Sequence, residues 1–143
     1  MEFYNSNDWR QFLNNRSISL LGMLPVLFKD MTPSILPTNA GVYVIFETIN
    51  NIDVPLYVGR TKNLRERIYT NHLMGGLSNA RLKKYIIADE LHPCYQNLSE
   101  AKNYIRNNCF VRWVFEDDYR RRGAIEGYIT AIIFPKYGIY EEH

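Results

Sequence analysis

Cysteine is scarce in this chain, and long apolar segments are absent. The 143 residues include two cysteines, Cys94 and Cys109, too few for a disulfide framework or a zinc site with four cysteine ligands. No apolar run approaches the ~18 residues that a membrane span requires. Residues 1–11 lack the basic and apolar segments of a signal peptide. These absences predict a cytoplasmic protein with reduced cysteines and no membrane partner.

The composition also lacks any strong bias. Hydrophobic residues make up 46 % and charged residues 22 % of the chain, values close to globular averages that exclude a disordered, collagenous or coiled-coil protein. The length suits a single domain. Aromatic residues reach 14 %, and 11 of them are tyrosines. A tyrosine joins an apolar ring to a polar hydroxyl, so it can either pack or take part in chemistry.

Positive and negative charges nearly balance over the whole chain, but the basic residues are unevenly distributed. The formal net charge is +2, whereas the stretch 60–84 holds seven basic residues and the single acidic Glu66. The basic residues are Arg60, Lys62, Arg65, Arg67, Arg81, Lys83 and Lys84. Such clustering favours a surface that faces a polyanion, although solvated helix faces would give the same pattern. A second basic run, 120–122, follows three acidic residues and indicates local charge pairing.

Local patterns predict an α/β domain with a small sheet. Residues 41–46 and 55–59 are rich in β-forming side chains and flank turn-forming asparagines, which predicts a hairpin with a rather long loop. The other expected elements are helices beginning near residues 61, 78, 99 and 117, and a strand over 109–115. We therefore expect a three-stranded, mainly antiparallel sheet flanked by helices.

Two tyrosines stand out because of the residues beside them. Tyr43 ends a Gly-Val-Tyr motif in the first expected strand, and Tyr57 begins Tyr-Val-Gly in the second. A hairpin places them on neighbouring strands. Gly59 allows the chain to turn sharply into the following helix, and Arg67 lies about two turns into that helix.

The order of these motifs resembles the GIY-YIG nuclease superfamily. The resemblance rests on GVY at 41–43, LYVGRTKNLRERI at 56–68, and Glu126 within IEGYITAIIFPKY. It implies a GIY-YIG-like nuclease domain over residues 37–143, preceded by an N-terminal extension, 1–36, of unknown role.

The resemblance implies roles for the matching residues. Tyr43 would be the general base and Tyr57 would help to orient the attacking water, while Arg67 would contact the scissile phosphate. Free tyrosine has a pKa of about 10. Near neutral pH, Tyr43 therefore needs nearby positive charge or a relay to a stronger base.

The remaining basic residues are candidates for nucleic-acid binding. Arg60 matches a position that often holds lysine in the family, and is a weaker candidate for phosphate contact. The residues expected to bind the DNA backbone without sequence preference are Lys62, Arg65, Arg81, Lys83 and Lys84.

Glu126 stands at an unusual place in the last expected helix. Ile129 and Ile133 follow it at helical spacing, so the carboxylate occupies an apolar stripe, where an unpaired charge is costly. Either a basic side chain such as Arg122 or a metal ion could pair with it. The resemblance favours a divalent cation, Mg²⁺ or Mn²⁺, that needs only one or two protein carboxylates.

The sequence departs from the family pattern at two places. Many members have an asparagine after Pro-x-Tyr, but Gly138 follows Tyr137 here and has no side chain to support the site. Many also have a histidine one helical turn beyond the arginine. Here His72 is five residues beyond Arg67, so it is a weaker catalytic candidate that could equally be a surface residue.

These observations lead to two hypotheses. The first is a divalent-metal-dependent DNA endonuclease that leaves 5′-phosphate and 3′-hydroxyl ends, with a homo-oligomer as one route to cutting both strands. The second is a weakly active or inactive module of the same fold that binds nucleic acid or regulates. The joint presence of Tyr43, Tyr57, Arg67 and Glu126 favours the first hypothesis, and Gly138 favours the second.

Overall fold

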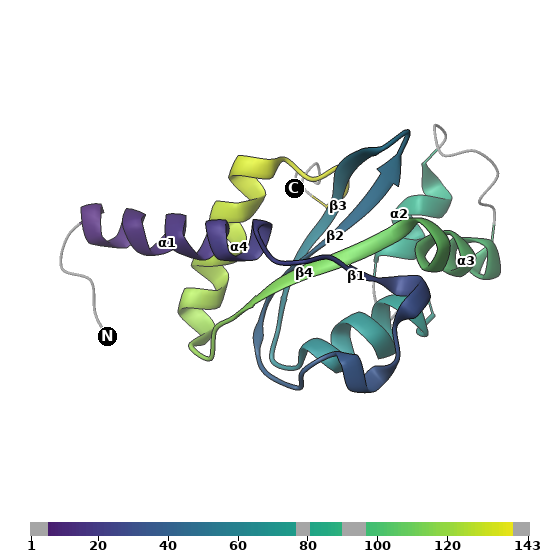
Figure 1. Ribbon diagram of the computed structural model, residues 1–143, viewed down its shortest axis with the longest axis horizontal. Coiled ribbons are helices and arrows are strands. Elements are labelled where there is room, and N and C mark those ends of the chain that lie inside the picture. Colours follow the sequence, from purple (N-terminus) through teal and green to yellow (C-terminus); the bar gives the residue numbers. More distant parts are fainter. Residues whose placement is uncertain (1–5, 77–80, 90–96, 139–143) are drawn as a thin grey trace.

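Four antiparallel strands form the centre of the molecule, in the order β1-β4-β2-β3 (Figure 1). The computed structural model describes residues 6–76, 81–89 and 97–138. The strands are β1 (Val26–Leu27), β2 (Gly41–Ile49), β3 (Ile52–Thr61) and β4 (Cys109–Phe115). The expected α/β class is confirmed. The sheet has a fourth strand, β1, that the sequence did not predict, because two residues are too few to show an alternating pattern.

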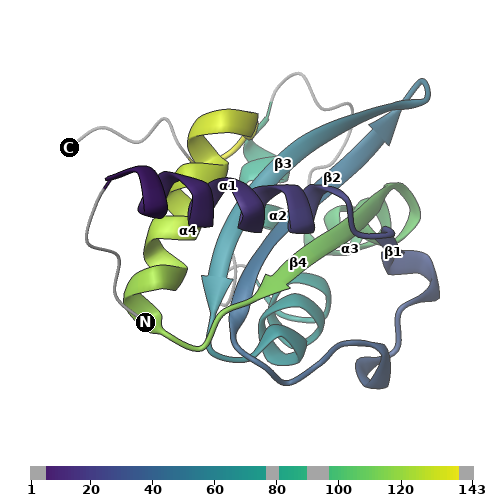
Figure 2. The same cartoon turned by 60° about the vertical axis from the view of Figure 1, so that its left-hand side comes forward.

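Helices cover both faces of this sheet. They are α1 (Ser6–Leu21), α2 (Leu82–Ala88), α3 (Leu98–Asn108), α4 (Tyr119–Ile133), the π-helix η3 (Glu66–Leu73) and the short 3₁₀ turns η1 (Phe28–Asp30) and η2 (Pro33–Ile35). Figures 1 and 2 show α1 and α4 on one side of the sheet and α2 and α3 on the other. The expected helix start at Ser78 lies outside the described residues.

The hairpin between β2 and β3 is tighter than expected. Asn50 and Asn51 alone connect the strands, and both have positive φ, 51° and 64°. Asparagine tolerates this conformation, and a two-residue turn of this kind matches the twist of the flanking strands. The prediction of a rather long loop was therefore wrong, because the strands continue to Ile49 and from Ile52.

The central strand β2 is buried on both faces. Tyr43 and Ile45 belong to the core that packs under η3, α2 and α3, whereas Val42 and Val44 belong to the core under α1 and α4. This alternation follows from the two-residue period of a strand. The sheet thereby holds Tyr43 rigidly, with none of its surface exposed.

The N-terminal segment contributes to the same two cores. Leu20 of α1 is fully buried beside Val44, and Phe28 of η1 is fully buried in the core on the Tyr43 side. Between them, β1 pairs with β4. Residues 6–36 are thus packed into the domain rather than appended to it. Within the described residues, no helix combines the length and apolar character needed to cross a membrane.

Candidate active site

Tyr43 lies at the centre of the site because of the strand register. It pairs with Gly59 on β3, and a side chain at residue 59 would collide with the hydroxyl group of Tyr43. Glycine therefore serves close approach here. The turn expected at Gly59 is not present, because β3 continues to Thr61. The phenol ring lies across the neighbouring strand and points toward η3.

Tyr57 lies on the same face of the hairpin. It is two residues before Gly59 and pairs with Ile45, which makes it a diagonal neighbour of Tyr43. The two ring centroids are 6.4 Å apart. The structure thus brings the two tyrosines together, with Tyr43 buried and Tyr57 half-buried.

Gly138 lies beside the ring of Tyr57. A Cβ at residue 138 would lie 3.7 Å from a ring carbon of Tyr57, and the backbone there has φ of +91°, a conformation that favours glycine. The position where family members often carry asparagine is therefore next to the site. In this chain it offers backbone only.

A π-helix brings Arg67 and His72 to the hydroxyl oxygen of Tyr43. In η3 the amide of Met74 donates to the carbonyl of Tyr69, five residues earlier, at 2.9 Å. Residues five apart therefore lie one turn apart, and π-helical turns are frequent at functional sites. Arg67 Nε donates to the Tyr43 hydroxyl at 3.3 Å, and His72 Nε2 lies 2.6 Å from the same oxygen.

His72 is consequently a buried partner of Tyr43 and not a surface residue. None of its surface is exposed, and its ring also packs edge-on against Tyr57, with centroids 5.1 Å apart. Among the described residues, its Nδ1 has no hydrogen-bond partner. The sequence underrated this histidine because spacing of five residues does not fit an α-helical turn.

Burial dominates the electrostatics of this pair. It lowers the pKa of His72 to about 3, with Arg67 and Lys83 acting in the same direction, so the imidazole is neutral near pH 7. Burial also raises the pKa of Tyr43 above its usual value, helped by Tyr57 and Glu126 and opposed by Arg67. Positive charge thus does not make Tyr43 acidic, and burial makes His72 a weak base as well. His72 Nε2 is nevertheless the group within hydrogen-bond distance of the Tyr43 hydroxyl.

Glu126 projects from α4 toward the end of β3. Its partner is Arg60, with 3.6 Å between Arg60 Nη1 and Glu126 Oε1, and its side chain is 29 % exposed. The expected pairing with a basic side chain is therefore present, but the partner is not Arg122, which is buried and donates to the carbonyls of Glu116 and Asp117. Burial raises the pKa of Glu126, and Arg60 opposes the shift.

The surroundings of Glu126 fit a hydrated divalent cation. No group of three or more His, Cys, Asp or Glu residues that could hold a metal ion occurs in the described part of the chain. Mg²⁺, however, keeps several of its waters and binds through one or two carboxylates. A half-buried carboxylate at an open surface meets that requirement, whereas a closed protein cage is not present in the described residues.

The structure separates the predicted DNA-binding residues into two groups. Lys83 is 1 % exposed, and its ammonium donates to the carbonyls of Leu73 and Gly75, both at 2.6 Å. Arg65 Nε donates to the carbonyl of Leu36 at 2.9 Å. These contacts tie Lys83 and Arg65 to the protein, so neither ammonium nor Nε is available to a phosphate.

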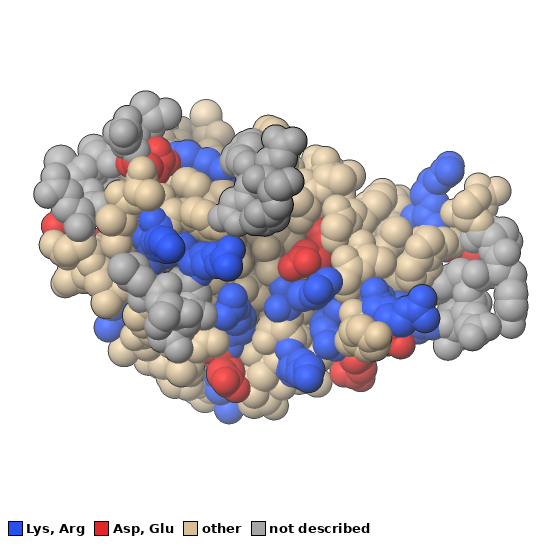
Figure 3. Space-filling model, turned by 180° about the vertical axis from the view of Figure 1, so that it is seen from behind, with Lys and Arg blue, Asp and Glu red and all other residues tan. Residues whose placement is uncertain are grey.

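The second group is exposed. Arg60, Lys62, Arg81 and Lys84 remain at the surface, and Figure 3 shows that Lys and Arg side chains gather across one face of the molecule. Fewer of the predicted basic residues are therefore exposed than the charge count suggested.

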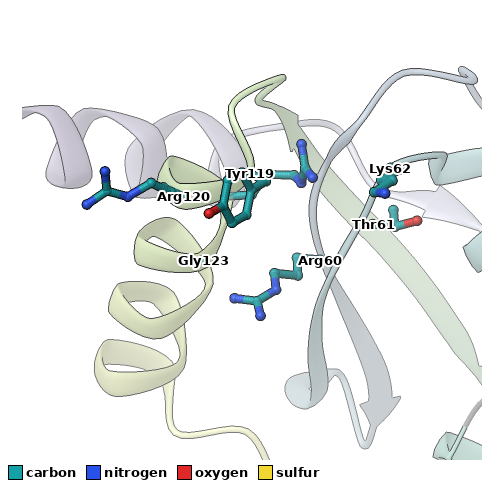
Figure 4. A pocket seen from close by; sticks show the side chains of 7 residues that line it. Arg60, Thr61, Lys62, Tyr119, Arg120 and Gly123 are labelled. Atoms are coloured by element: carbon teal, nitrogen blue, oxygen red, sulfur yellow. The ribbon is translucent and has the colours of Figure 1, made fainter. Parts of the chain in front are cut away.

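Sequence reasoning missed an open pocket of about 760 Å³ next to Glu126. It is lined by Arg60 and Thr61 of β3, by Lys62 directly after this strand, and by Tyr119, Arg120, Arg122 and Gly123 of α4 (Figure 4). The available signal was the basic run 120–122, which was interpreted as charge pairing within its own segment.

Two tyrosine hydroxyls and a guanidinium come together on the η3 side of the sheet, and Glu126 of α4 is close enough to influence Tyr43 electrostatically. Groups of these types can stabilise the charge that develops in phosphodiester hydrolysis. A family model described as the GIY-YIG catalytic domain matches residues 39–129, more than half of the chain. The chain therefore belongs to the GIY-YIG family of nucleases.

One curated relative is similar over a short stretch. UvrABC system protein C of Chlamydia caviae (strain ATCC VR-813 / DSM 19441 / 03DC25 / GPIC) is 41 % identical over 54 residues, which cover 38 % of this chain and 8 % of the relative. The match thus spans a small part of that protein's length. No solved structure gives a significant match.

Proposed function

We propose that this domain is a divalent-metal-dependent DNA endonuclease that hydrolyses phosphodiester bonds to 5′-phosphate and 3′-hydroxyl ends. The observation that carries the proposal is the meeting of Arg67 Nε and His72 Nε2 at the hydroxyl of Tyr43. A tyrosine held in this way has its proton directed at one acceptor, which leaves an oxygen lone pair for a second proton.

Tyr43 acts as a proton relay in this mechanism. Its oxygen accepts a proton from the attacking water while its own proton moves to Nε2 of the neutral His72. The water oxygen forms a bond to phosphorus, and the bond from phosphorus to the 3′ oxygen breaks. The departing oxygen takes a proton from solvent. His72 is a positioning residue, because it acts through the hydroxyl of Tyr43.

Arg67 stabilises the charge that develops on the phosphate. Its Nε donates to the hydroxyl of Tyr43 at 3.3 Å, so the guanidinium would lie where the activated water and the phosphate must meet. A guanidinium stays charged at all relevant pH values and its fork of donors matches phosphate oxygens. Tyr57 borders the same space and would orient the water.

Glu126 would hold the divalent cation, Mg²⁺ or Mn²⁺. When bound, such a cation stabilises negative charge on the phosphate and on the departing 3′ oxygen. Arg60 lies against the carboxylate and opposes the rise in its pKa that burial causes. Arg60 and Lys62, together with Arg81 and Lys84, would bind the DNA backbone.

We further propose that residues 37–143 carry the catalysis and that residues 1–36 support it. The two cysteines suit a reducing compartment such as the cytoplasm. One site of this kind cuts one strand, so cutting both strands requires two events or a homo-oligomer.

Plasmid cleavage tests the proposal. Purified protein should nick supercoiled plasmid with Mg²⁺ and not in the presence of a chelator, and Glu126→Gln should abolish nicking while keeping the melting temperature. Glu66→Gln is the matched control, because Glu66 is an exposed carboxylate at the start of η3. Metal-dependent nicking by Glu126→Gln at the wild-type rate would contradict the metal assignment.

The same experiment separates the alternative, a module that binds DNA without cutting it. Gly138 beside Tyr57 favours this alternative, since no side chain there can support the ring. Binding of DNA without metal-dependent nicking would support the module and overturn the endonuclease.

A further inference from the structure

The pocket between β3 and α4 lies next to the proposed cation site. Tyr119, Gly123 and Glu126 follow one another along one side of α4 at spacings of four and three residues, which places them on the same face of the helix. Tyr119 and Glu126 are therefore separated by about 10 Å along the helix axis. A ligand in the pocket would therefore lie beside the cation proposed to bind at Glu126.

Glycine at residue 123 opens the floor of this pocket. A Cβ at that position would lie 2.6 Å from Arg60 Nη1, so any larger residue would displace the guanidinium. Arg60 can thus lie flat against α4 between Tyr119 and Glu126, with 55 % of its side chain exposed. Figure 4 shows Arg60 in the space between β3 and α4, with Lys62 just beyond the end of β3.

Tyr119 is the most unusual lining residue. It is 72 % exposed, although a tyrosine ring is more often partly covered. Its ring stands over the pocket at the first turn of α4 (Figure 4). An exposed aromatic ring beside cationic side chains is the arrangement that binds single-stranded nucleic acid, because bases stack on the ring while phosphates contact the cations.

We propose that this pocket binds an unpaired nucleotide next to the scissile phosphate, so that the domain prefers single-stranded or branched DNA to a continuous duplex. The proposal rests on the endonuclease function proposed above. Tyr119 stacks on the base, and Arg60 and Lys62 contact the adjoining phosphates. In a continuous duplex the bases are stacked on one another and cannot reach the ring.

Binding measured without metal tests this proposal independently of cleavage. The probe is a short fluorescein-labelled DNA strand, alone or annealed to its complement, followed by anisotropy in chelator. We expect the single strand to bind more tightly than the duplex. Tyr119→Ala should weaken single-strand binding at least about fivefold and change duplex binding less than about twofold.

Two further variants isolate the ring. Tyr119→Phe keeps the stacking surface and should bind like the wild type. Tyr128→Ala is the matched control, because Tyr128 lies nine residues along α4 on the opposite face, where its hydroxyl donates to Asn14 at 3.4 Å. Melting temperatures of all variants verify folding.

The outcomes distinguish this proposal from the endonuclease. Equal losses on single strand and duplex, no loss with Tyr119→Ala, or a wild type that prefers the duplex would each overturn the pocket assignment. If Tyr119-dependent binding is found but no DNA is cut with Mg²⁺, the pocket stands and the endonuclease fails. Cleavage that is equally fast on duplex and branched DNA would overturn the pocket and leave the endonuclease.

Discussion

The two side-chain pairs of this site, Tyr43–His72 and Arg60–Glu126, differ in their access to water. The Tyr43–His72 pair is fully buried, and burial favours the neutral form of both groups. The Arg60–Glu126 pair is partly exposed and carries opposite charges. The buried pair holds a directed hydrogen bond between neutral groups, whereas the partly exposed ionic pair is of a kind that can take up a hydrated cation or a phosphate. The difference in burial thus separates a neutral, hydrogen-bonded pair from an ionic pair within one site.

The largest expected effect comes from breaking the dry pair. Tyr43→Phe removes one hydroxyl and keeps the ring, so the strand should pack normally. Loss of a general base typically lowers the rate about 10²-fold or more, whereas loss of a structural hydrogen bond costs about 1 kcal/mol of stability. Single-turnover cleavage, DNA affinity and melting temperature, measured on one preparation, separate these effects.

Tyr57→Phe is the companion variant. Tyr57 is half-buried and borders the site without touching His72 through its hydroxyl, so we expect a smaller loss of rate than for Tyr43→Phe. Equal losses in both variants would show that the two tyrosines share the proton transfer. Wild-type cleavage by Tyr43→Phe would remove this residue from the mechanism.

The second expected effect is a pH-dependent loss of stability caused by His72. Its pKa is about 3 in the folded protein and about 6.5 when unfolded. Between these values the unfolded chain binds more protons, so the free energy of unfolding falls as pH falls. The expected loss from pH 7.5 to 4.5 is about 2 to 3 kcal/mol.

Denaturant unfolding of wild type and His72→Gln checks this effect. The variant should lack that part of the pH dependence, and the difference between the two proteins isolates His72 from the other titrating groups. Parallel pH profiles for both proteins would show that His72 is not held neutral by burial.

A smaller effect contrasts a buried and an exposed lysine. Lys83→Met leaves the carbonyls of Leu73 and Gly75 without their donor, which should cost about 1 to 3 kcal/mol of stability. Lys84→Met should keep stability and reduce the salt dependence of DNA binding by about 0.9 in slope, the value for one phosphate contact. Unfolding curves and salt titrations of binding measure the two effects. A lower slope for Lys83→Met in a protein of unchanged stability would reverse the assignment.

The last expected effect concerns how the N-terminal segment packs against the sheet. Leu20→Ala removes a fully buried side chain of α1 and should cost about 2 to 4 kcal/mol, whereas Leu24→Ala, at a residue 84 % exposed, should cost nothing measurable. Thermal unfolding compares the two. Equal stability of both variants would return residues 1–36 to the status of an appended extension.

The sequence predicted the elements that local patterns encode. Alternating β-formers and the glycine motifs placed Tyr43 and Tyr57 on adjacent strands, and Asp118 caps α4 close to where the helix was expected to begin. Contacts between distant segments were not readable. Arg60 reaches Glu126 across the fold, whereas sequence spacing suggested Arg122, four residues earlier on the same helix.

Two further misses have physical causes. The π-helical winding of η3 moves His72 under Tyr43, and α-helical spacing could not anticipate that rotation. Lys83 is basic like its neighbours, but a charge count carries no information about burial. Both errors therefore arose where tertiary structure overrides a local rule.

The magnesium dependence of single-turnover cleavage tests the division between the two pairs most directly. Wild type and Tyr43→Phe are compared over a titration of Mg²⁺, with DNA bound in advance. The account predicts that Tyr43→Phe lowers the maximal rate about 10²-fold or more and leaves the magnesium concentration for half-maximal rate unchanged. A variant whose rate is restored by added magnesium would contradict the account, because the buried hydroxyl would then serve the cation and not the proton.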